Sequence, residues 1–308
     1  MNILITGGGG FQGSHLAEFL LEQGHAVSVL NAYSPTAVSN LSQIADKIKV
    51  IWGDVNDKEI IDNSVTGQDV IFHLAGYINV DQSLQDPLSV FKVNIFGTCN
   101  VLESVRKNKN RLIYVSSREV YGDGEDNKPI NEASELKPNS PYAASKAAAD
   151  IICYAYFKSY DLDVTIVRPF NVYGERQKSG PYGALIPILT AKALKGEGLT
   201  IFGDGSPTRD YSHISDIVRG YNLILNNNNL KGKAINLASG QNVKIKDIAE
   251  YIAGKFNVSV KYAASRPSEV KHILADISFA RSLGFSPQVD IWEGIDRYIE
   301  WAKNNSND

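Results

Sequence analysis

The stretch NILITGGGGFQGSHLAEFLLEQGHAVSVL, residues 2–30, decides the fold class. Its first five residues form a short apolar run without helical period, which is typical of a buried strand. Beyond the glycines, apolar residues recur at helical spacing, and Gly24 stands where a helix C-terminus is expected. Residues 27–30 return to a strand pattern. The stretch therefore predicts a strand, a glycine loop, a helix and a second strand.

The glycines Gly7, Gly10 and Gly13 of this loop have the spacing GxxGxxG. In a strand–loop–helix unit, the first glycine permits a tight turn and the second lets backbone approach a pyrophosphate. The third lets the helix pack on the strand. A glycine-rich turn that binds nothing is the alternative, and the flanking strand and helix disfavour it. The loop, including Phe11 and Gln12, is predicted to bind a dinucleotide.

Position 31, at the end of the second predicted strand, bears on the choice between NAD and NADP. Dinucleotide-binding units usually carry an acidic residue here, which binds the adenosine ribose hydroxyls. This chain has Asn31, which can hydrogen-bond a hydroxyl but lacks the charge that repels a 2′-phosphate. No arginine follows to bind such a phosphate. The sequence favours NAD as the cofactor.

Strand-like segments continue along the chain, at residues 49–51, 70–76, 112–117 and 164–168. They alternate with helix-like segments, and repeated units of this kind indicate parallel strands with right-handed crossovers. The predicted fold class is α/β, with a Rossmann-type doubly wound parallel sheet in an NAD-binding domain over residues 1–170.

Beyond that domain, glycine and proline become frequent. Residues 171–308 are predicted to form a smaller, C-terminal α+β domain that binds the substrate. Segments near 213–240 keep helix and strand patterns, and we expect them to rejoin the sheet.

The composition of the 308 residues excludes several classes of protein. With 43% hydrophobic and 21% charged residues, the chain is too apolar to be disordered. Its 31 Lys and Arg against 34 Asp and Glu give a net charge of −3. Such a balance provides no long-range attraction to nucleic acid or to an anionic membrane, and neither is expected as a partner.

Two cysteines, Cys99 and Cys153, are too few for a disulfide framework or a zinc cluster, and no metal is predicted. No signal-peptide pattern follows Met1, and no apolar run approaches the ~20 residues of a membrane helix. The predicted location is the cytoplasm.

Tyr142 and Lys146, four residues apart, share one face of a predicted helix. Ser140 suits the N-cap of that helix and Pro141 its first position. An ammonium beside a phenol, and a helix N-terminus, both lower the pKa of the phenol from its usual ~10. The pair is predicted to be a general acid/base near neutral pH. The alternative is a surface pair on an alanine-rich helix.

Ser116 and Ser117 end a predicted strand, and ligands bind at such strand ends in open α/β sheets. A hydroxyl there can hydrogen-bond the substrate oxygen whose proton Tyr142 exchanges. Ser117 is therefore predicted to be catalytic, and the combination of glycine loop, strand-end serine and Tyr-x-x-x-Lys is specific.

With these residues, the chain resembles the extended short-chain dehydrogenase/reductases, specifically the nucleotide-sugar epimerases and dehydratases such as UDP-glucose 4-epimerases. The resemblance covers nearly the whole chain. The motifs that carry it are TGGGGFQG (6–13), GDV (53–55), HLAG (73–76), VNIFGT (93–98), SSREVYG (116–122), YAASK (142–146), RPFNVYGERQ (168–177), GDGSPTRDYSHISD (203–216) and RPSEV (266–270).

The resemblance implies further site residues. Those on the cofactor side are Asp54 and Val55 at the adenine, Ala75 and Gly76 along the cofactor path, and Asn94, which supports the active-site helix. Those on the side of the nucleotide-diphosphate sugar are Asn171, which contacts the sugar nucleotide, and Arg209 and Arg266, which hold its phosphates or ribose. Arginine suits this task because its planar fork donates two bonds to a phosphate.

The implied chemistry is transient oxidation at the sugar C4. In an epimerase the 4-keto sugar turns over and takes the hydride back on the other face. In a dehydratase or decarboxylase another bond breaks first. One scaffold serves all three reactions, so the fold does not choose between them.

Arg118 and Glu119 follow Ser117, where the resembling 4,6-dehydratases carry an Asp-Glu pair that protonates the leaving hydroxyl and removes the C5 proton. An arginine stays charged at neutral pH and is no general acid, which disfavours 4,6-dehydration. Glu119 leaves C5 proton abstraction or decarboxylation open, unless it forms an ion pair with Arg118. Alternatively, Arg118 recognises a substrate carboxylate.

A 4-epimerase is the first prediction, and a 4,6-dehydratase or a uronate decarboxylase that uses Glu119 is the alternative. An NAD-dependent small-alcohol dehydrogenase does not need Arg209 and Arg266. An inactive NAD-binding regulator is expected to have lost Tyr142 or Lys146. In the resembling family, helices corresponding to residues 87–106 and 142–160 pair across a two-fold axis, which implies a homodimer.

Overall fold

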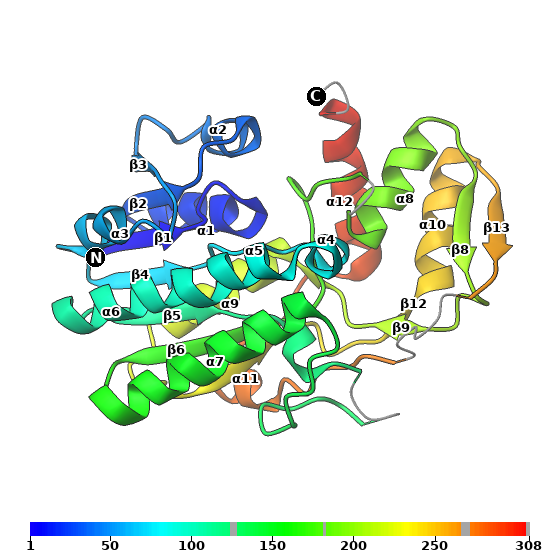
Figure 1. The fold of residues 1–308 in the computed structure, drawn as a ribbon. Coiled ribbons are helices and arrows are strands. Elements are labelled where there is room, and N and C mark those ends of the chain that lie inside the picture. Colours follow the sequence, from blue (N-terminus) through cyan, green and yellow to red (C-terminus); the bar gives the residue numbers. More distant parts are fainter. Residues whose placement is uncertain (124–127, 181–182, 266–271, 306–308) are drawn as a thin grey trace. The chain divides into compact units, whose positions relative to one another are not determined.

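The computed structural model of the chain describes residues 1–123, 128–180, 183–265 and 272–305 (Figure 1). Contacts divide the chain into two compact units. Unit 1 consists of residues 1–122, 135–169 and 218–235, and unit 2 of residues 123–134, 170–217 and 236–308. The sequence predicts a boundary at residue 170 and segments near 213–240 that rejoin the sheet. The two units interleave along the chain, and residues 218–235 belong to unit 1.

The main sheet has seven strands in the order β11-β6-β5-β4-β1-β2-β3. Its strands are β1 (Asn2–Thr6), β2 (Ala26–Asn31), β3 (Lys49–Trp52), β4 (Val70–His73), β5 (Arg111–Val115), β6 (Val164–Pro169) and β11 (Ala234–Leu237). Every pairing from β3 through β1 to β6 is parallel. The strand order reverses direction at β1, which has β2 on one side and β4 on the other. This topology confirms the predicted doubly wound α/β fold.

The helical segments around the sheet are α1 (Phe11–Glu22), α2 (Pro35–Leu41), α3 (Lys58–Val65), α4 (Val80–Gln85), α5 (Pro87–Phe91), the π-helical turn η1 (Lys92–Gly97), α6 (Thr98–Asn108), the 3₁₀ turn η2 (Arg118–Tyr121), α7 (Pro141–Tyr160) and α9 (Ile214–Leu225). Helices α6 and α7 pack side by side in front of the sheet in Figure 1. Side chains of α3 complete the core on this face. On the strands, Leu4 and Ile71 face these helices, whereas the neighbouring Phe72 lies 6.2 Å from Tyr221 of α9 between ring centroids. The sheet is therefore buried on both faces, as side-chain alternation requires.

Local signals explain where α7 begins and ends. The Ser140 side chain accepts a hydrogen bond from Ala143 N, and Pro141 occupies the first turn, as the sequence predicts. The helix ends at Asp161, which adopts the left-handed conformation with φ of 53°. These caps place Tyr142 in the first turn and Lys146 one turn later.

Unit 2 contains β7 (Val172–Tyr173), α8 (Leu185–Leu194), β8 (Leu199–Phe202), β9 (Thr208–Arg209), β10 (Ser212–His213), β12 (Val243–Lys244), α10 (Ile245–Phe256), β13 (Val260–Ala263), α11 (Ser278–Ser282) and α12 (Ile291–Asn304). Its strands pair two by two, β7 with β10, β8 with β13 and β9 with β12. Helices α8, α10 and α12 contribute the apolar side chains of its core. Within the described residues, no helix is both long and apolar enough to cross a membrane.

Candidate active site

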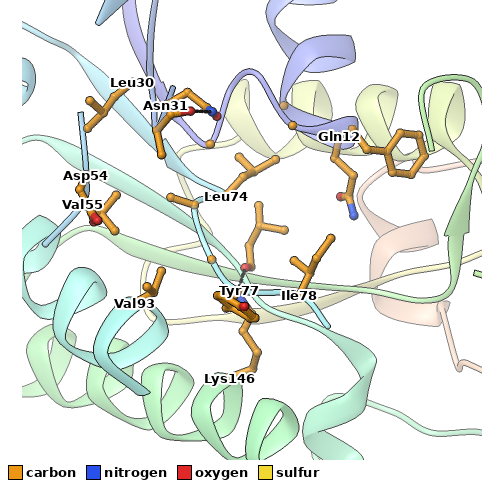
Figure 2. Close-up of a pocket in the computed structure, with 18 of the residues that line it drawn as sticks. Gln12, Leu30, Asn31, Asp54, Val55, Leu74, Tyr77, Ile78, Val93 and Lys146 are labelled. Carbon is orange, nitrogen blue, oxygen red and sulfur yellow. Dashed lines mark hydrogen bonds between the residues drawn. The ribbon is translucent and has the colours of Figure 1, made fainter. Parts of the chain in front are cut away.

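A cavity of about 400 Å³ lies in unit 1 (Figure 2). It is lined by the glycine loop and by residues at or just beyond the carboxyl ends of β2, β3, β4 and β5. Lining side chains also come from α7, namely Tyr142 and Lys146. In open parallel sheets, ligands bind outside the carboxyl ends of the strands where the strand order reverses. The cavity occupies that position, and its volume suits a small-molecule ligand.

The glycine loop leaves the start of α1 open toward the cavity. Gly7 has φ of +73°, and a Cβ on Gly13 would collide with the Gly7 carbonyl oxygen. The N-cap Gly10 offers no side chain, and the first helical bond runs from Ser14 N to Gly10 O. The backbone N–H groups between these two residues therefore have no helical acceptor, and they suit a diphosphate. The predicted dinucleotide fits this loop.

Asn31 holds the glycine loop from the end of β2. Its Oδ1 accepts from Gly9 N at 3.0 Å, and its Nδ2 donates to Ala32 O at 2.7 Å. Asn40 of α2 donates to Gly9 O at 3.0 Å. Asn31 lines the cavity, but its amide also serves a structural task that the sequence analysis does not include.

The other predicted cofactor residues separate into two groups. Asp54, Val55, Ala75 and Gly76 line the cavity, whereas Asn94 does not. The Asn94 side chain lies in the π turn η1, where its Oδ1 accepts from Tyr77 N at 2.6 Å. Its Nδ2 donates to Ser145 Oγ of α7 at 2.8 Å. These bonds fit the supporting role toward the active-site helix that the resemblance implies.

Tyr142 and Lys146 line the cavity, and Ser117 lies beside the Tyr142 phenol without being part of the lining. Tyr142 is 8% exposed, and the Ser117 side chain lies close enough to its phenol to lower the pKa of Tyr142. Lys146 is equally buried; its Nζ donates to Val115 O at 2.7 Å and lies 4.7 Å from the centroid of the Tyr114 ring. Ser116 lines the cavity, and within the described residues its Oγ is buried without a hydrogen-bond partner. Of the two strand-end serines, Ser117 is thus the one beside the phenol.

The predicted direction of the Tyr142 pKa is wrong for the chain alone. Burial raises the pKa of Tyr142 to about 12, and the neighbouring Ser117 side chain and the Arg118 charge offset only part of this rise. Burial also lowers the pKa of Lys146 to about 8. The Lys146 ammonium donates its hydrogen bond to a strand carbonyl. Desolvation of the Tyr142 phenol raises its pKa more than the helix N-terminus lowers it. Spacing along a helix does not reveal such burial.

Arg118 and Glu119 form an ion pair beside Tyr142, since both charges act on the pKa of its phenol. Arg118 is buried, and its Nη1 also donates to Gly122 O at 3.2 Å. Glu119 N donates to Ser117 Oγ at 3.2 Å, which caps the 3₁₀ turn η2. The ion pair weighed as an alternative for Glu119 is therefore present. A contact of Arg118 with substrate stays a prediction.

A second buried ion pair lies behind the active-site helix, and the sequence analysis missed it. Arg168 Nε at the end of β6 donates to Asp150 Oδ2 at 2.7 Å, and its Nη1 donates to Tyr121 Oη at 2.8 Å. Burial raises the pKa of Asp150, while Arg168 opposes this rise. The sequence contained part of the signal for this pair, because Asp150 follows Lys146 by four residues and so shares its face of the helix.

In unit 2, Asn171 and Arg209 are described, and Arg266 lies outside the described residues. Asn171, with φ of +29°, donates from Nδ2 to Asp210 O at 2.9 Å. Arg209 Nη1 donates to Thr208 O at 2.9 Å. The roles of all three in substrate binding stay predictions.

Asp210, next to Arg209, is a buried carboxylate that the sequence analysis missed. It accepts from Ser239 Oγ at 2.6 Å and from the backbone N of Ser239, Gly240 and Ala275 at 2.9, 3.0 and 3.2 Å. Burial raises the pKa of Asp210 to about 6, against the lowering effect of these donors. These hydrogen bonds fix the position of Asp210 and thereby hold the backbone next to Arg209 in place.

Within the described residues, no group of three or more His, Cys, Asp or Glu side chains is placed to hold a metal ion.

Comparisons with known proteins extend this description. The model of the NAD dependent epimerase/dehydratase family matches residues 3–238. UDP-glucose 4-epimerase of Mycolicibacterium smegmatis is 33% identical over 319 residues, covering 99% of this chain and 100% of that protein. UDP-N-acetyl-alpha-D-glucosaminuronate decarboxylase of Bacillus cytotoxicus is 31% identical over 320 residues, covering 99% and 98%.

A solved structure shows the same similarity in three dimensions. A dTDP-glucose 4,6-dehydratase from Streptomyces venezuelae, determined with NAD bound, has a TM-score of 0.90 and 31% identity, covering 99% of this chain and 98% of that one. The family resemblance expected from the motifs is thus confirmed. This chain belongs to the NAD-dependent epimerase/dehydratase family and is an enzyme of that family.

Proposed function

We propose that the chain is an NAD-dependent nucleotide-sugar 4-epimerase that acts by transient oxidation at the sugar C4. NAD is assigned to the cavity because the open start of α1 suits a diphosphate and because Tyr142 and Lys146 line the same cavity. Bound NAD would supply the acceptor, and later the donor, of the hydride. Relatives named as a 4-epimerase and a decarboxylase act on nucleotide sugars, which supports the substrate class.

The three catalytic side chains have separate tasks in this proposal. Tyr142 Oη takes the proton of the 4-hydroxyl during oxidation and returns it during reduction. Ser117 lies beside the phenol and is proposed to contact the same sugar oxygen. Lys146 contributes positive charge next to the cavity and is held by Val115 O. Asn171 and Arg209 of unit 2, with Arg266, are proposed to bind the sugar nucleotide.

The ion pair between Arg118 and Glu119 is the observation that favours epimerisation over dehydration. A 4-epimerase needs only one acid/base, whereas dehydration also needs an acid for the leaving hydroxyl and a base at C5. Arg118 remains charged and cannot be that acid. Glu119, the remaining candidate base, is engaged by the guanidinium of Arg118.

Incubation with a panel of UDP-, GDP-, CDP- and dTDP-sugars, with products identified by NMR, tests this assignment. The expected product has an inverted C4 centre. A C6 methyl group would identify a dehydratase, carbon dioxide a decarboxylase, and net NADH a plain dehydrogenase.

Two tyrosine variants test the catalytic side chain within the same panel. Tyr142→Phe is expected to lower turnover by at least ~10²-fold, the usual contribution of a general acid/base, while NAD still binds. Tyr156→Phe is the matched control, because Tyr156 lies on the same helix and bonds Glu103 at 2.6 Å. Unchanged turnover in Tyr142→Phe would reject the assigned role.

Uronate decarboxylation is the second candidate, and one observation favours it. Among the described residues, Arg118 Nε is buried without a hydrogen-bond partner, so the guanidinium can still receive a substrate carboxylate. Under this alternative, Arg118→Ala lowers turnover of a uronate substrate much more than that of a neutral sugar. Equal losses for the two substrates reject it. We also propose that the chain forms a homodimer and is cytoplasmic, and cell fractionation tests the location.

A further inference from the structure

The second residue of α1, Gln12, has a side chain that is fixed from behind. Tyr221 of α9 donates from its hydroxyl to Gln12 Oε1 at 2.6 Å. Tyr221 is fully buried, and within the described residues its hydroxyl has no other partner. A buried O–H needs an acceptor, so the oxygen of the Gln12 amide faces Tyr221 and the NH₂ group faces away.

Gln12 is also one of the residues that line the cavity, and in the described part of the chain its Nε2 has no hydrogen-bond acceptor. In Figure 2 the side chain comes from the start of α1 and lies across the cavity from Asp54 and Val55. It therefore stands at the open helix end that suits a diphosphate.

The charges around the cavity make an added donor useful there. The charged residues of the lining are Asp54 and Lys146, and Lys146 donates to Val115 O. A diphosphate bound at the start of α1 has no arginine of the lining to neutralise it. Its oxygens depend on backbone N–H groups and on neutral side-chain donors.

We propose that Gln12 Nε2 donates a hydrogen bond to the diphosphate of the bound dinucleotide, and that Tyr221 is the positioning residue that turns this donor toward it. The inference rests on the proposed NAD site and adds two side chains to it. Gln12 acts directly on the ligand, whereas Tyr221 acts only through Gln12.

Titration calorimetry of the full nucleotide-free chain with NAD, ADP-ribose and adenosine tests the contact. Gln12→Met keeps the length of the side chain and is expected to weaken NAD and ADP-ribose about tenfold, as loss of a bond to a charged acceptor does. Adenosine, which has no diphosphate, is expected to bind unchanged. Gln12→Glu still accepts from Tyr221 but places negative charge at the diphosphate, so its loss is expected to exceed that of Gln12→Met.

A double-mutant cycle tests the positioning role. Tyr221→Phe is expected to weaken NAD binding about threefold. The Gln12 amide is then free to rotate and keeps part of a hydrogen bond whose complete loss weakens binding about tenfold. In the Gln12→Met background the same change is expected to have no further effect. Tyr298→Phe is the matched control: it removes a hydroxyl that donates to Gln177 O at 3.1 Å in unit 2, and NAD affinity is expected to stay unchanged.

Several outcomes would overturn the inference. Equal affinity of Gln12→Met for NAD rejects the contact, and a loss for NAD without one for ADP-ribose assigns the donor to the nicotinamide half instead. Additive losses in the cycle make Tyr221 merely structural. A wild-type chain that binds neither NAD nor ADP-ribose rejects the proposed NAD site itself.

Discussion

Tyr142 shows how burial and chemistry compete at a single residue. Its pKa of about 12 leaves the phenol protonated at neutral pH, although the proposed reaction needs it to accept a proton. The chain supplies Ser117 and Arg118 as lowering influences, and Glu119 opposes them. The remaining change has to come from a positive charge nearby, which the oxidised nicotinamide ring of NAD carries.

We therefore expect Tyr142 to ionise near pH 12 in the chain alone and at lower pH once NAD is bound. The measurement is ultraviolet difference titration of phenolate, wild type minus Tyr142→Phe, with and without NAD. The raised pKa also predicts how stability depends on pH. The unfolded chain loses the Tyr142 proton at lower pH than the folded chain, so the free energy of unfolding falls as pH rises above ~10. An identical titration with and without NAD would contradict the expectation.

Asn31 gives a second prediction at this scale. Asn31→Asp keeps the acceptor for Gly9 N, which Asn31 Oδ1 now provides at 3.0 Å, and adds negative charge at the end of β2. We expect the preference for NAD over NADP to rise about tenfold, because a carboxylate repels a 2′-phosphate. The ratio of the two dissociation constants measures it. Asn31→Ala is the control, in which both cofactors are expected to weaken alike.

At the scale of elements, the segments with local signals were the ones that the sequence predicted well. The glycine loop, the N-cap at Ser140 and the strands of the sheet depend on residues close together in the chain. The π turn η1 interrupts the helical stretch predicted over residues 87–106, and its Asn94 is held by Ser145 of a distant helix. No periodicity within the stretch encodes that contact.

The candidate site likewise has features that the sequence predicted and features that it did not. Spacing brought Tyr142 and Lys146 to one helix face, and the strand-end position indicated Ser117. The direction of the Tyr142 pKa was missed because burial depends on everything packed around the phenol. The hydrogen bond between Gln12 and Tyr221 joins residues 209 positions apart, and nothing local in either segment announces it.

The buried ion pair between α7 and β6 leads to a prediction about stability. Arg168→Met removes the ion-pair partner of Asp150, a residue that is 2% exposed. We expect the free energy of unfolding to fall by about 3–5 kcal/mol, the usual cost of an uncompensated buried charge. Denaturant unfolding measures it.

A surface pair provides the matched control for this prediction. Lys255→Met breaks a pair with Asp296 whose side chains are 43% and 44% exposed, and we expect a cost below about 1 kcal/mol. Equal costs for the two variants would show that the buried pair contributes no more than the exposed one. The double variant Asp150→Leu/Arg168→Met is expected to recover part of the loss.

At the scale of the whole molecule, one face of unit 1 is unusually apolar. Its large exposed side chains are Leu84 of α4, Leu88 of α5, Phe96 of η1, and Ile151 and Tyr154 of α7, each 49–74% exposed. Helices α4, α5 and α7 contact one another, so these side chains lie on adjoining helices. A group of large exposed apolar side chains is typical of a protein interface.

We expect this surface to join two copies of the chain into the homodimer that the family resemblance implies. Leu88→Glu and Ile151→Glu together are expected to convert the dimer to monomers, as light scattering after gel filtration would show. Tyr33→Glu changes an aromatic residue that is 72% exposed on another part of unit 1, and the dimer is expected to persist. A wild-type monomer at all concentrations would reject the prediction.

The position of β11 has a consequence for biosynthesis. This strand covers the outer edge of β6, yet it consists of residues 234–237 of a chain of 308. While a ribosome is still translating the intervening codons, the nascent polypeptide carries β6 with an unpaired backbone edge, the kind of edge that recruits other strands and aggregates. A gene cut after codon 170 would make that exposure permanent, and it would also omit the helix that bears Tyr221.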